Sequence, residues 1–393
     1  MSHRGNHVAI SVKQDYLTSM SMESTNRIGS RLKAARERSG LTQQQLADAV
    51  GLRHRQTVAS IESGERRLSA SELIGIMPVL GVDLDYFTDP FRLVGEGQFS
   101  FRTSAGVEPQ VLDRFEQRAG MWIATYRELS REEGHPPRWL GYKLNLSADS
   151  SFEDAQAAGE AAVEAWGLGP RPAERLRSVM EDRLHVLVLH VDMPPGVSGA
   201  ASRVPGLNCA LINRQESTGQ RKFDLAHELF HLLTWDALPP ERATVVNQRV
   251  RGSKWRVEKL AENFAAALLM PAPALKPAWD SEADADDMHD RINKVASQFR
   301  VSSPACKWRL YNLGLLSKRD LGGIEDWRLS GKGHARCGDR ERPLFSASFA
   351  ERLSVALDRG RLSVKRAAAL LGVSVTLLAE ILHDYGHETY FEA

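Results

Sequence analysis

The residues with the clearest chemical potential lie at 223–231, in the run F-D-L-A-H-E-L-F-H. His227 and His231 are four residues apart, so on a helix both imidazoles lie on one face and can bind one metal ion. Glu228 lies beside them and can accept a proton from a water activated by that metal. Residues 221–238 contain no Gly or Pro and are largely apolar, which predicts a buried helix. The alternative is a half-buried helix whose histidines are satisfied by hydrogen bonds.

A third ligand is expected from residues 257–271, V-E-K-L-A-E-N-F-A-A-A-L-L-M-P, a strongly helix-forming stretch that prolines end. Glu258 shares one stripe of this helix with alanines, and a carboxylate on such a face can lie close to a neighbouring helix. Glu262, one turn later, is the rival, and a solvated helix charge is the alternative for either residue. Two histidines, one glutamate and a water make a catalytic zinc site with an open position.

The two segments together resemble the ImmA/IrrE family of zinc metallopeptidases, whose helices read roughly A-H-E-L-G-H and E-x-x-A-N-x-F-A-A-x-L-L-M-P. The resemblance covers roughly residues 150–320. Aligned on L-L-M-P, the glutamate ligand of the family falls on Glu258. Glu262 stands at the family's Asn position and Phe230 at its Gly position. The resemblance implies an α+β, zincin-like endopeptidase with Zn²⁺ bound by His227, His231 and Glu258 and with Glu228 as the catalytic base.

Residues 27–90 predict a compact set of short helices. Thr42 is a good N-cap, Gly51 ends the helix that follows it, and a second helix runs from about Arg53 to Glu62. Helix, glycine turn and a helix bearing Arg, Gln and Thr suit a reader of the DNA major groove. Residues 27–67 hold nine Lys or Arg against four Asp or Glu, a local excess of five positive charges, whereas the whole chain has a net charge of +1. Nucleic acid would therefore be attracted locally.

This segment resembles the phage-repressor (Cro/C1, or XRE-type) helix-turn-helix, through L-T-Q-Q-Q-L-A, V-A-S-I-E-S-G-E-R and L-G-V-D-L-D-Y-F. The resemblance implies a double-stranded DNA operator as partner and, because such domains bind two half-sites, a homodimer. A helical bundle with a merely solvated face is the alternative. By resemblance, Gln43 would contact a phosphate and a second set of residues would face or approach the bases: Arg53, Arg55, Gln56, Thr57 and Ser60.

Composition places the chain among globular proteins, with 42% apolar and 26% charged residues in 393. Cys209, Cys306 and Cys337 are scattered without C-x-x-C spacing, which suggests a reducing compartment. No run of eighteen apolar residues exists, and the N-terminus lacks an apolar signal core. A cytoplasmic location and no membrane contact are expected.

The predicted fold is multi-domain: an all-α helix-turn-helix domain, an α+β zincin-like domain and a small C-terminal helical unit. Residues 184–191, 197–204 and 207–213 are the strand candidates before the metal helix, and a sheet edge beside the site would hold an extended peptide. The C-terminal unit echoes the helix–glycine–helix pattern, but its second helix lacks Arg, which favours a structural or dimerising role. The expected divisions are a flexible leader (1–25), the DNA-binding domain (26–90), a connecting or dimerising helical region (91–150), the metallopeptidase domain (151–320), a linker (321–343) and the C-terminal unit (344–393).

Two functions fit these features. The first is a DNA-binding regulator with an endopeptidase domain that cleaves a partner regulatory protein, as in phage or stress-response systems. The second is a transcriptional repressor, or the antitoxin of a toxin–antitoxin pair, whose zinc domain senses or binds a partner without turnover. The intact Glu228 favours the first, because a purely structural site needs the ligands but not the base.

Overall fold

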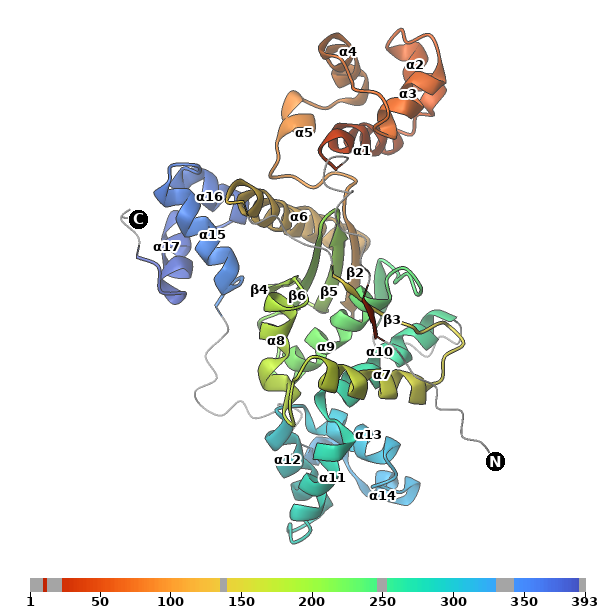
Figure 1. The fold of residues 1–393 in the computed structure, drawn as a ribbon, viewed down its shortest axis with the longest axis vertical. Coiled ribbons are helices and arrows are strands. Elements are labelled where there is room, and N and C mark those ends of the chain that lie inside the picture. The colour runs from red at the N-terminus through yellow and green to blue at the C-terminus, as the bar shows by residue number, and fades with distance from the viewer. Residues whose placement is uncertain (1–9, 13–22, 135–139, 246–252, 330–342, 389–393) are drawn as a thin grey trace.

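The computed structural model describes residues 10–12, 23–134, 140–245, 253–329 and 343–388 (Figure 1). Much of the predicted leader and of the predicted linker lies outside these ranges. The described residues form three groups of elements: an N-terminal helical domain, a mixed sheet covered by helices on both faces, and a set of helices that follows residue 271 (Figure 1).

The N-terminal domain is all-helical, as predicted. Its core packs Leu46 and Val58 of the two short central helices against Leu32 and Phe87. Thr42 caps the first of these two helices in a capping box with Gln45, and Gly51 takes the left-handed backbone that the tight turn needs. The domain consists of α1 (Glu23–Arg38), α2 (Gln43–Ala49), α3 (Arg55–Glu62), α4 (Ala70–Leu80) and α5 (Leu84–Thr88).

A five-stranded mixed sheet forms the centre of the second domain. The three strand candidates became β4 (Val186–Val191), β5 (Val197–Val204) and β6 (Leu207–Asn213). Two further strands extend the sheet beyond β5, namely β2 (Gln98–Thr103) and β7 (Ala243–Val245). The order is β4-β6-β5-β2-β7; β5 is antiparallel to β6 and β2, while β4 is parallel to β6 and β7 is parallel to β2. The α+β expectation is therefore confirmed.

The segment predicted to connect the domains thus supplies a strand of the sheet as well as a long helix. β2 pairs with β5, so the strand that lies over the metal helix is not a free edge. The edges of the sheet lie at β4 and β7 instead. The paired residues of β2 and β5 are about 100 positions apart, and pairing over that distance leaves no signal in local sequence periodicity, so the sequence pattern does not predict it.

Alternate residues of β4 and of β6 pack into different cores. Val186 and Val188 of β4 face one core, and Leu187 and Leu189 face the other. The first core contains the two helices that carry the predicted metal ligands, α9 (Thr218–Thr234) and α10 (Ser253–Leu269), together with α7 (Phe152–Ala165) and α8 (Pro172–Asp182). The second contains α6 (Pro109–Glu132) and the C-terminal helices α15 (Ala347–Asp358), α16 (Val364–Leu371) and α17 (Val375–Asp384).

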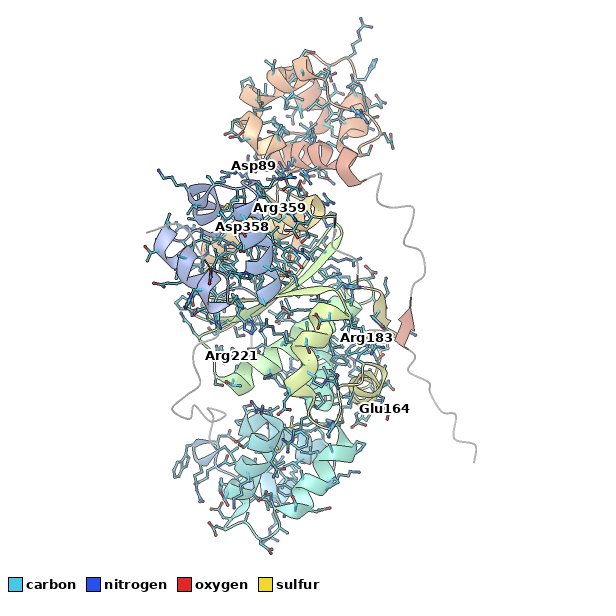
Figure 2. The ribbon with its side chains drawn as sticks, turned by 60° about the vertical axis from the view of Figure 1, so that its left-hand side comes forward. Asp89, Glu164, Arg183, Arg221, Asp358 and Arg359 are labelled. Atoms are coloured by element: carbon cyan, nitrogen blue, oxygen red, sulfur yellow. The ribbon has the colours of Figure 1, made fainter. Side chains whose placement is uncertain are left out.

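The predicted C-terminal unit is thus part of the covering of the sheet. Trp122 of α6 donates its indole N–H to the carbonyl of Leu371, and Phe345 pairs with His190 at the β4 edge. Arg366 of α16 also pairs with Asp89 of the N-terminal domain at 2.8 Å; Figure 2 labels Asp89 between that domain and the C-terminal helices. These contacts agree with a structural role; a dimerising role stays a prediction.

Smaller elements complete the chain. A short antiparallel pair joins β1 (Ile10–Val12) to β3 (Tyr142–Leu144). The helices after α10 are α11 (Ala272–Ser281), α12 (Met288–Phe299), α13 (Ser303–Asn312), α14 (Lys318–Gly323) and the 3₁₀ turn η1 (Asp326–Arg328). Within the described ranges, no single helix has the length and apolarity to cross a membrane; α16 and α17 meet that test only as a pair bent by 85°.

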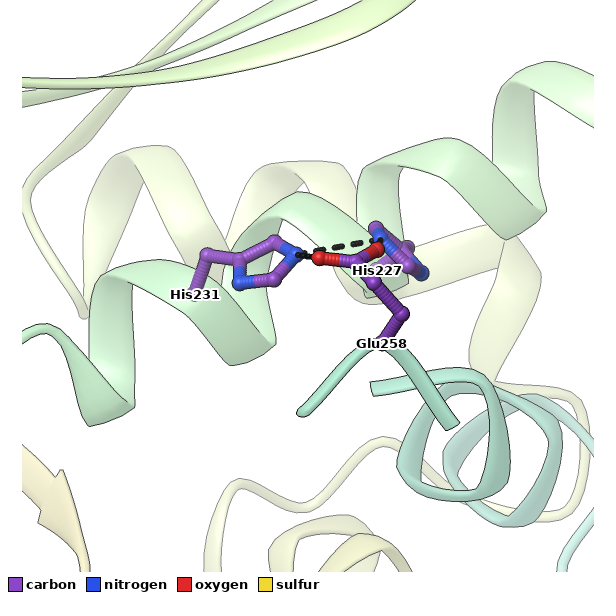
Figure 3. A group of neighbouring side chains, drawn as sticks. All are labelled: His227, His231 and Glu258. Carbon is purple, nitrogen blue, oxygen red and sulfur yellow. Dashed lines mark hydrogen bonds and ion pairs between the residues drawn. The ribbon is translucent and has the colours of Figure 1, made fainter. Parts of the chain in front are cut away.

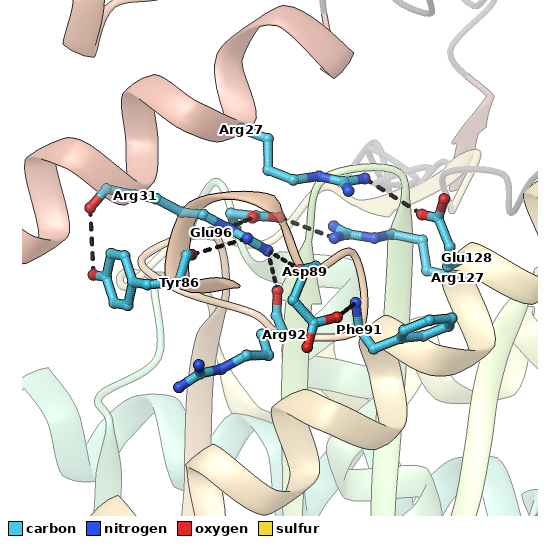
Figure 4. Close-up of polar contacts among 9 residues, drawn as sticks. All are labelled: Arg27, Arg31, Tyr86, Asp89, Phe91, Arg92, Glu96, Arg127 and Glu128. Atoms are coloured by element: carbon cyan, nitrogen blue, oxygen red, sulfur yellow. Dashed lines mark hydrogen bonds and ion pairs between the residues drawn. The ribbon is translucent and has the colours of Figure 1, made fainter. Parts of the chain in front are cut away.

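A buried ion-pair cluster joins the N-terminal domain to the second domain (Figure 4). Glu96, in the segment that leads into β2, accepts from Arg31 of α1 at 3.2 Å and from Arg127 of α6 at 2.9 Å. Arg31 also donates to the carbonyl oxygens of Tyr86 and Asp89. One carboxylate between two buried guanidinium groups therefore holds α1, the β2 segment and α6 together.

Candidate functional site

Helix α9 carries both histidines of the candidate metal centre, and α10 carries the glutamate (Figure 3). The Nε2 atoms of His227 and His231 lie 3.1 Å apart. Glu258 places one oxygen 3.2 Å from Nε2 of His227 and the other 3.5 Å from Nε2 of His231. Zinc bonds of about 2.0–2.2 Å put tetrahedral ligand atoms roughly 3.3–3.6 Å apart. The three measured distances, 3.1, 3.2 and 3.5 Å, are close to these values, so the three side chains can hold one zinc ion.

Close packing of α7 against α10 brings Glu258 to this position. A Cβ on Gly159 of α7 would lie 2.6 Å from the backbone oxygen of Phe264, so only glycine fits at this crossing. Ala155 and Ala162 of α7 and Ala261 of α10 are also fully buried here. The small residues let the two helix backbones approach, and α10 in turn packs on α9.

The rival glutamate lies elsewhere. Glu262 pairs with Lys259 on its own helix at 2.5 Å and is half-buried. It is not among the residues whose ligand atoms converge, which are His227, His231 and Glu258. Between the two candidates left open by the residue pattern, the geometry favours Glu258.

The surroundings of His227 and Glu258 shift their pKa values toward the protonation states that bind a metal cation. Burial and, to a smaller extent, the nearby Arg102 lower the pKa of His227 to about 3, so the imidazole is neutral at neutral pH. Burial tends to raise the pKa of Glu258, but the adjacent His231 and His227 outweigh it and bring the pKa below the ordinary value. A neutral imidazole and an ionised carboxylate are the forms that bind metal.

Glu228 lies beneath β5, on the side of α9 that faces the sheet. Its side chain is 1% exposed, and a Cβ on Gly199 of β5 would lie 2.9 Å from its Oε1. That oxygen has no hydrogen-bond partner among the described residues. Burial and the nearby Asp224 raise the pKa of Glu228 well above its usual value. A carboxylate of raised pKa is a stronger proton acceptor, as a general base requires.

A buried ion pair beside this base was missed at the sequence level. Arg102 of β2 donates to Asp224, which lies one turn before Glu228 on α9. Asp224 is fully buried and Arg102 is 9% exposed. Burial raises the pKa of Asp224 to about 6, although Arg102 and Gln220 act to lower it. The available signal was Asp224 itself, because a carboxylate within an apolar helix needs a positive partner.

The predicted DNA-reading residues lie on or before α3. Arg53, Arg55 and Gln56 are exposed, and Thr57 and Ser60 are half-buried. Ser60 donates its hydroxyl to the carbonyl of Gln56. On the opposite side, Val58 and Ile61 lie in the domain core. The exposed face of α3 is thus the one that carries the predicted contacts, and their roles stay predictions.

Gln43, the predicted phosphate contact, lies at the start of α2 and is engaged within the domain. It donates to Glu62 at 2.9 Å, and Glu62 is also bound by Arg36 at 2.6 Å. Arg36 and Arg31 are both buried in ion pairs and cannot lie against a phosphate in this conformation. Burial of the Arg36–Glu62 pair removes one counted cation and one counted acid, so it leaves the excess unchanged. Only Arg31, whose partner Glu96 lies outside the counted segment, reduces the excess at the surface, from five to four.

These features define a helix-turn-helix DNA-binding domain joined to an α+β domain with a two-histidine, one-glutamate centre. Residues 32–87 match the helix-turn-helix family model. Residues 181–311 match a peptidase-family model described as the IrrE N-terminal-like domain, which contains all four candidate site residues of α9 and α10. The chain therefore carries both domains that the two resemblances implied.

One solved structure, Bacillus thuringiensis PlcR in complex with the peptide PapR7 and DNA, is similar to this chain at 14% identity. The match covers 92% of this chain and 96% of that one, but its TM-score is 0.16, so no conclusion about fold or function rests on it. No curated protein matches the chain.

Proposed function

We propose that the chain is a DNA-binding transcriptional regulator whose IrrE-like domain is a zinc-dependent endopeptidase. The observation that carries this proposal is the convergence of His227, His231 and Glu258 at zinc-ligand spacing, with Glu228 on the adjacent face of the same helix. A structural zinc site has no need of a buried carboxylate next to its ligands, one of whose oxygens has no hydrogen-bond partner among the described residues. A hydrolytic site does need such a base.

Zinc held by these ligands would polarise a water and a peptide carbonyl. Glu228 would take the proton of the water and pass it to the leaving amine, a role that its raised pKa supports. Gly199 leaves room for that carboxylate under β5. The histidines are almost wholly buried while the Glu258 side chain is 15% exposed, so substrate would approach from the Glu258 side.

The exposed face of α3 supports binding to an operator, with contacts from Arg53, Arg55, Gln56, Thr57 and Ser60 and with Gln43 released from Glu62 toward a phosphate. We expect two copies to bind two half-sites as a homodimer in the cytoplasm. The substrate would be a partner regulatory protein.

Metal content tests the centre. Elemental analysis of wild type is expected to give about one zinc per chain, which Glu258→Ala loses and Glu262→Ala keeps. A protein without bound metal, or one whose metal content does not depend on Glu258, would overturn the assignment.

Glu228→Gln separates cleavage from binding. The variant is expected to keep zinc and DNA binding and to lose regulation in cells, because only the base is removed. If Glu228→Gln regulates normally, the domain senses or binds a partner without turnover.

A further inference from the structure

Strand β2 presents two different faces to the two cores. Phe99 and Phe101 lie in the core that contains α6, whereas Gln98 and Arg102 contact residues of the α9 side. In the β2–β5 register, Arg102 is the Cα partner of Gly199. Gly199 lies directly over Glu228, so Arg102 enters the site from the neighbouring strand at the level of the base.

Arg102 contacts the first half of the metal helix. Its guanidinium donates to Asp224 and lies 5.7 Å from the ring centre of Phe223. Gln220 donates to the same oxygen, Oδ1 of Asp224, at 2.9 Å. Since Asp224 precedes His227 by three residues and Glu228 by four, its position sets the rotation of α9 about its own axis.

A second contact from the same strand lies at the other end of the helix. Gln98 accepts from the indole N–H of Trp235, directly after α9, at 2.9 Å. β2 therefore contacts the metal helix both before and after its two histidines. Such an arrangement resists rotation and sliding of α9, and both motions would change the spacing of the His227 and His231 nitrogens.

Arg102 is a cation that lies near several carboxylates. Burial alone would lower the pKa of Arg102, but Asp224, Glu262, Glu228 and Glu258 together raise it. Arg102 therefore stays charged among carboxylates of both α9 and α10. Replacing it by a neutral residue leaves Asp224 buried without its counter-charge, next to the base.

We propose that Arg102 is a positioning residue of the metal centre, acting through Asp224. The inference rests on the proposed metal site. It adds that Arg102, which lies about 125 positions before His227 and outside the matched IrrE-like segment, fixes the rotation and axial position of α9. Arg102 does not ligate the metal. Its loss alters the geometry of the ligands rather than their number.

The test uses the full-length protein loaded with Co²⁺, whose visible absorption reports ligand geometry, and with Zn²⁺, whose transfer to a chelator reports its release rate. Arg102→Gln is expected to release zinc about tenfold faster or more and to change the Co²⁺ spectrum, as for other residues that orient metal ligands. Arg102→Lys keeps the charge and should recover part of the loss. The double variant Arg102→Gln with Asp224→Asn removes both charges and should lie closer to wild type than Arg102→Gln alone.

Glu160→Gln is the matched control. It weakens another ion pair of the same domain, with the buried Arg309, near the far end of α10 from Glu258. This variant is expected to unfold at lower denaturant concentration while zinc release and the Co²⁺ spectrum stay as in wild type.

Two results would overturn the proposal separately. If Arg102→Gln and the double variant lower stability like Glu160→Gln but leave zinc release and the Co²⁺ spectrum unchanged, Arg102 is only a packing residue. If wild type takes up neither Co²⁺ nor Zn²⁺, the proposed metal site itself fails, and this inference fails with it. Should Arg102→Gln not fold, Arg102→Lys and the double variant decide the question.

Discussion

Replacing Glu96 by glutamine should detach the DNA-binding domain from the rest of the chain. Glu96 is the shared acceptor of Arg31 and Arg127, whose side chains are 0% and 2% exposed (Figure 4). Burial lowers the pKa of both arginines, and Glu96 is the group that opposes this shift. Glutamine has the same shape but no charge, so it leaves two buried cations without a counter-ion.

Removing one partner of a buried ion pair typically destabilises a protein by about 3–5 kcal/mol. Arg31 keeps its bonds to the carbonyl oxygens of Tyr86 and Asp89, which places the expected loss near the lower value, about 3 kcal/mol. The neighbouring pair of Arg27 with Glu128, at 3.4 Å, is partly exposed. Glu128→Gln is therefore expected to cost at most about 1 kcal/mol and serves as the control.

Urea unfolding followed by circular dichroism measures the loss, and limited proteolysis locates it. In Glu96→Gln, cleavage between residues 89 and 97 should become faster while the N-terminal domain itself still binds DNA, because its own core does not include Glu96. A Glu96→Gln protein as stable and as protease-resistant as Glu128→Gln would refute the reasoning, since the cluster would then not hold the domains together.

Three further outcomes are expected. In Gly199→Ala, the new Cβ would lie 2.9 Å from Oε1 of Glu228 and displace that carboxylate by roughly 0.5 Å. Peptide cleavage should therefore fall about tenfold or more, with zinc content unchanged. The control is Gly75→Ala, whose Cβ meets nothing within 4 Å and which should leave both cleavage and zinc content unchanged. Burial lowers the pKa of His227 from 6.5 to about 3, so as pH falls the unfolded chain binds this proton before the folded chain does. Between pH 6.5 and about 3, the metal-free protein should therefore lose up to about 1.4 kcal/mol of unfolding free energy per pH unit. Denaturation measured at a series of pH values should show a smaller dependence of stability on pH for His227→Gln. Removing zinc with a chelator should lower the melting temperature of wild type, because a ligand present at a thousand times its Kd stabilises by about 4 kcal/mol, and should leave Glu258→Ala unaffected.

Local sequence was enough to predict the elements that carry the site. Periods of 3.6 and 2 residues, glycine turns and capping residues depend on neighbours within about one turn, so α2, α3, α9 and α10 and the strands β4, β5 and β6 could be predicted from single stretches. The spacing of His227 and His231 also belongs to this class, because one helix places both. The metal motif and the second helix predicted the peptidase-type domain, and the helix–glycine–helix pattern in residues 27–90 predicted the helix-turn-helix domain; family models match both.

The sequence alone could not predict contacts between distant segments. Asp224 and Arg102 are 122 residues apart, and only the insertion of β2 beside β5 brings them together. The same is true of Arg31 and Arg36, whose charges count toward a DNA-binding surface in the sequence but are neutralised in buried pairs in the fold.

The sequence by itself determined the chemistry available to this protein: two histidines and a base on one helix, a glutamate on the next, and a helix-turn-helix domain with an exposed polar face. The tertiary structure decided which glutamate meets the histidines, which cation lies beside the base, and that the C-terminal helices cover the second face of the sheet. Local patterns specify elements, whereas the pairing of elements depends on burying apolar faces and compensating charges across the whole chain, which no single stretch of sequence contains.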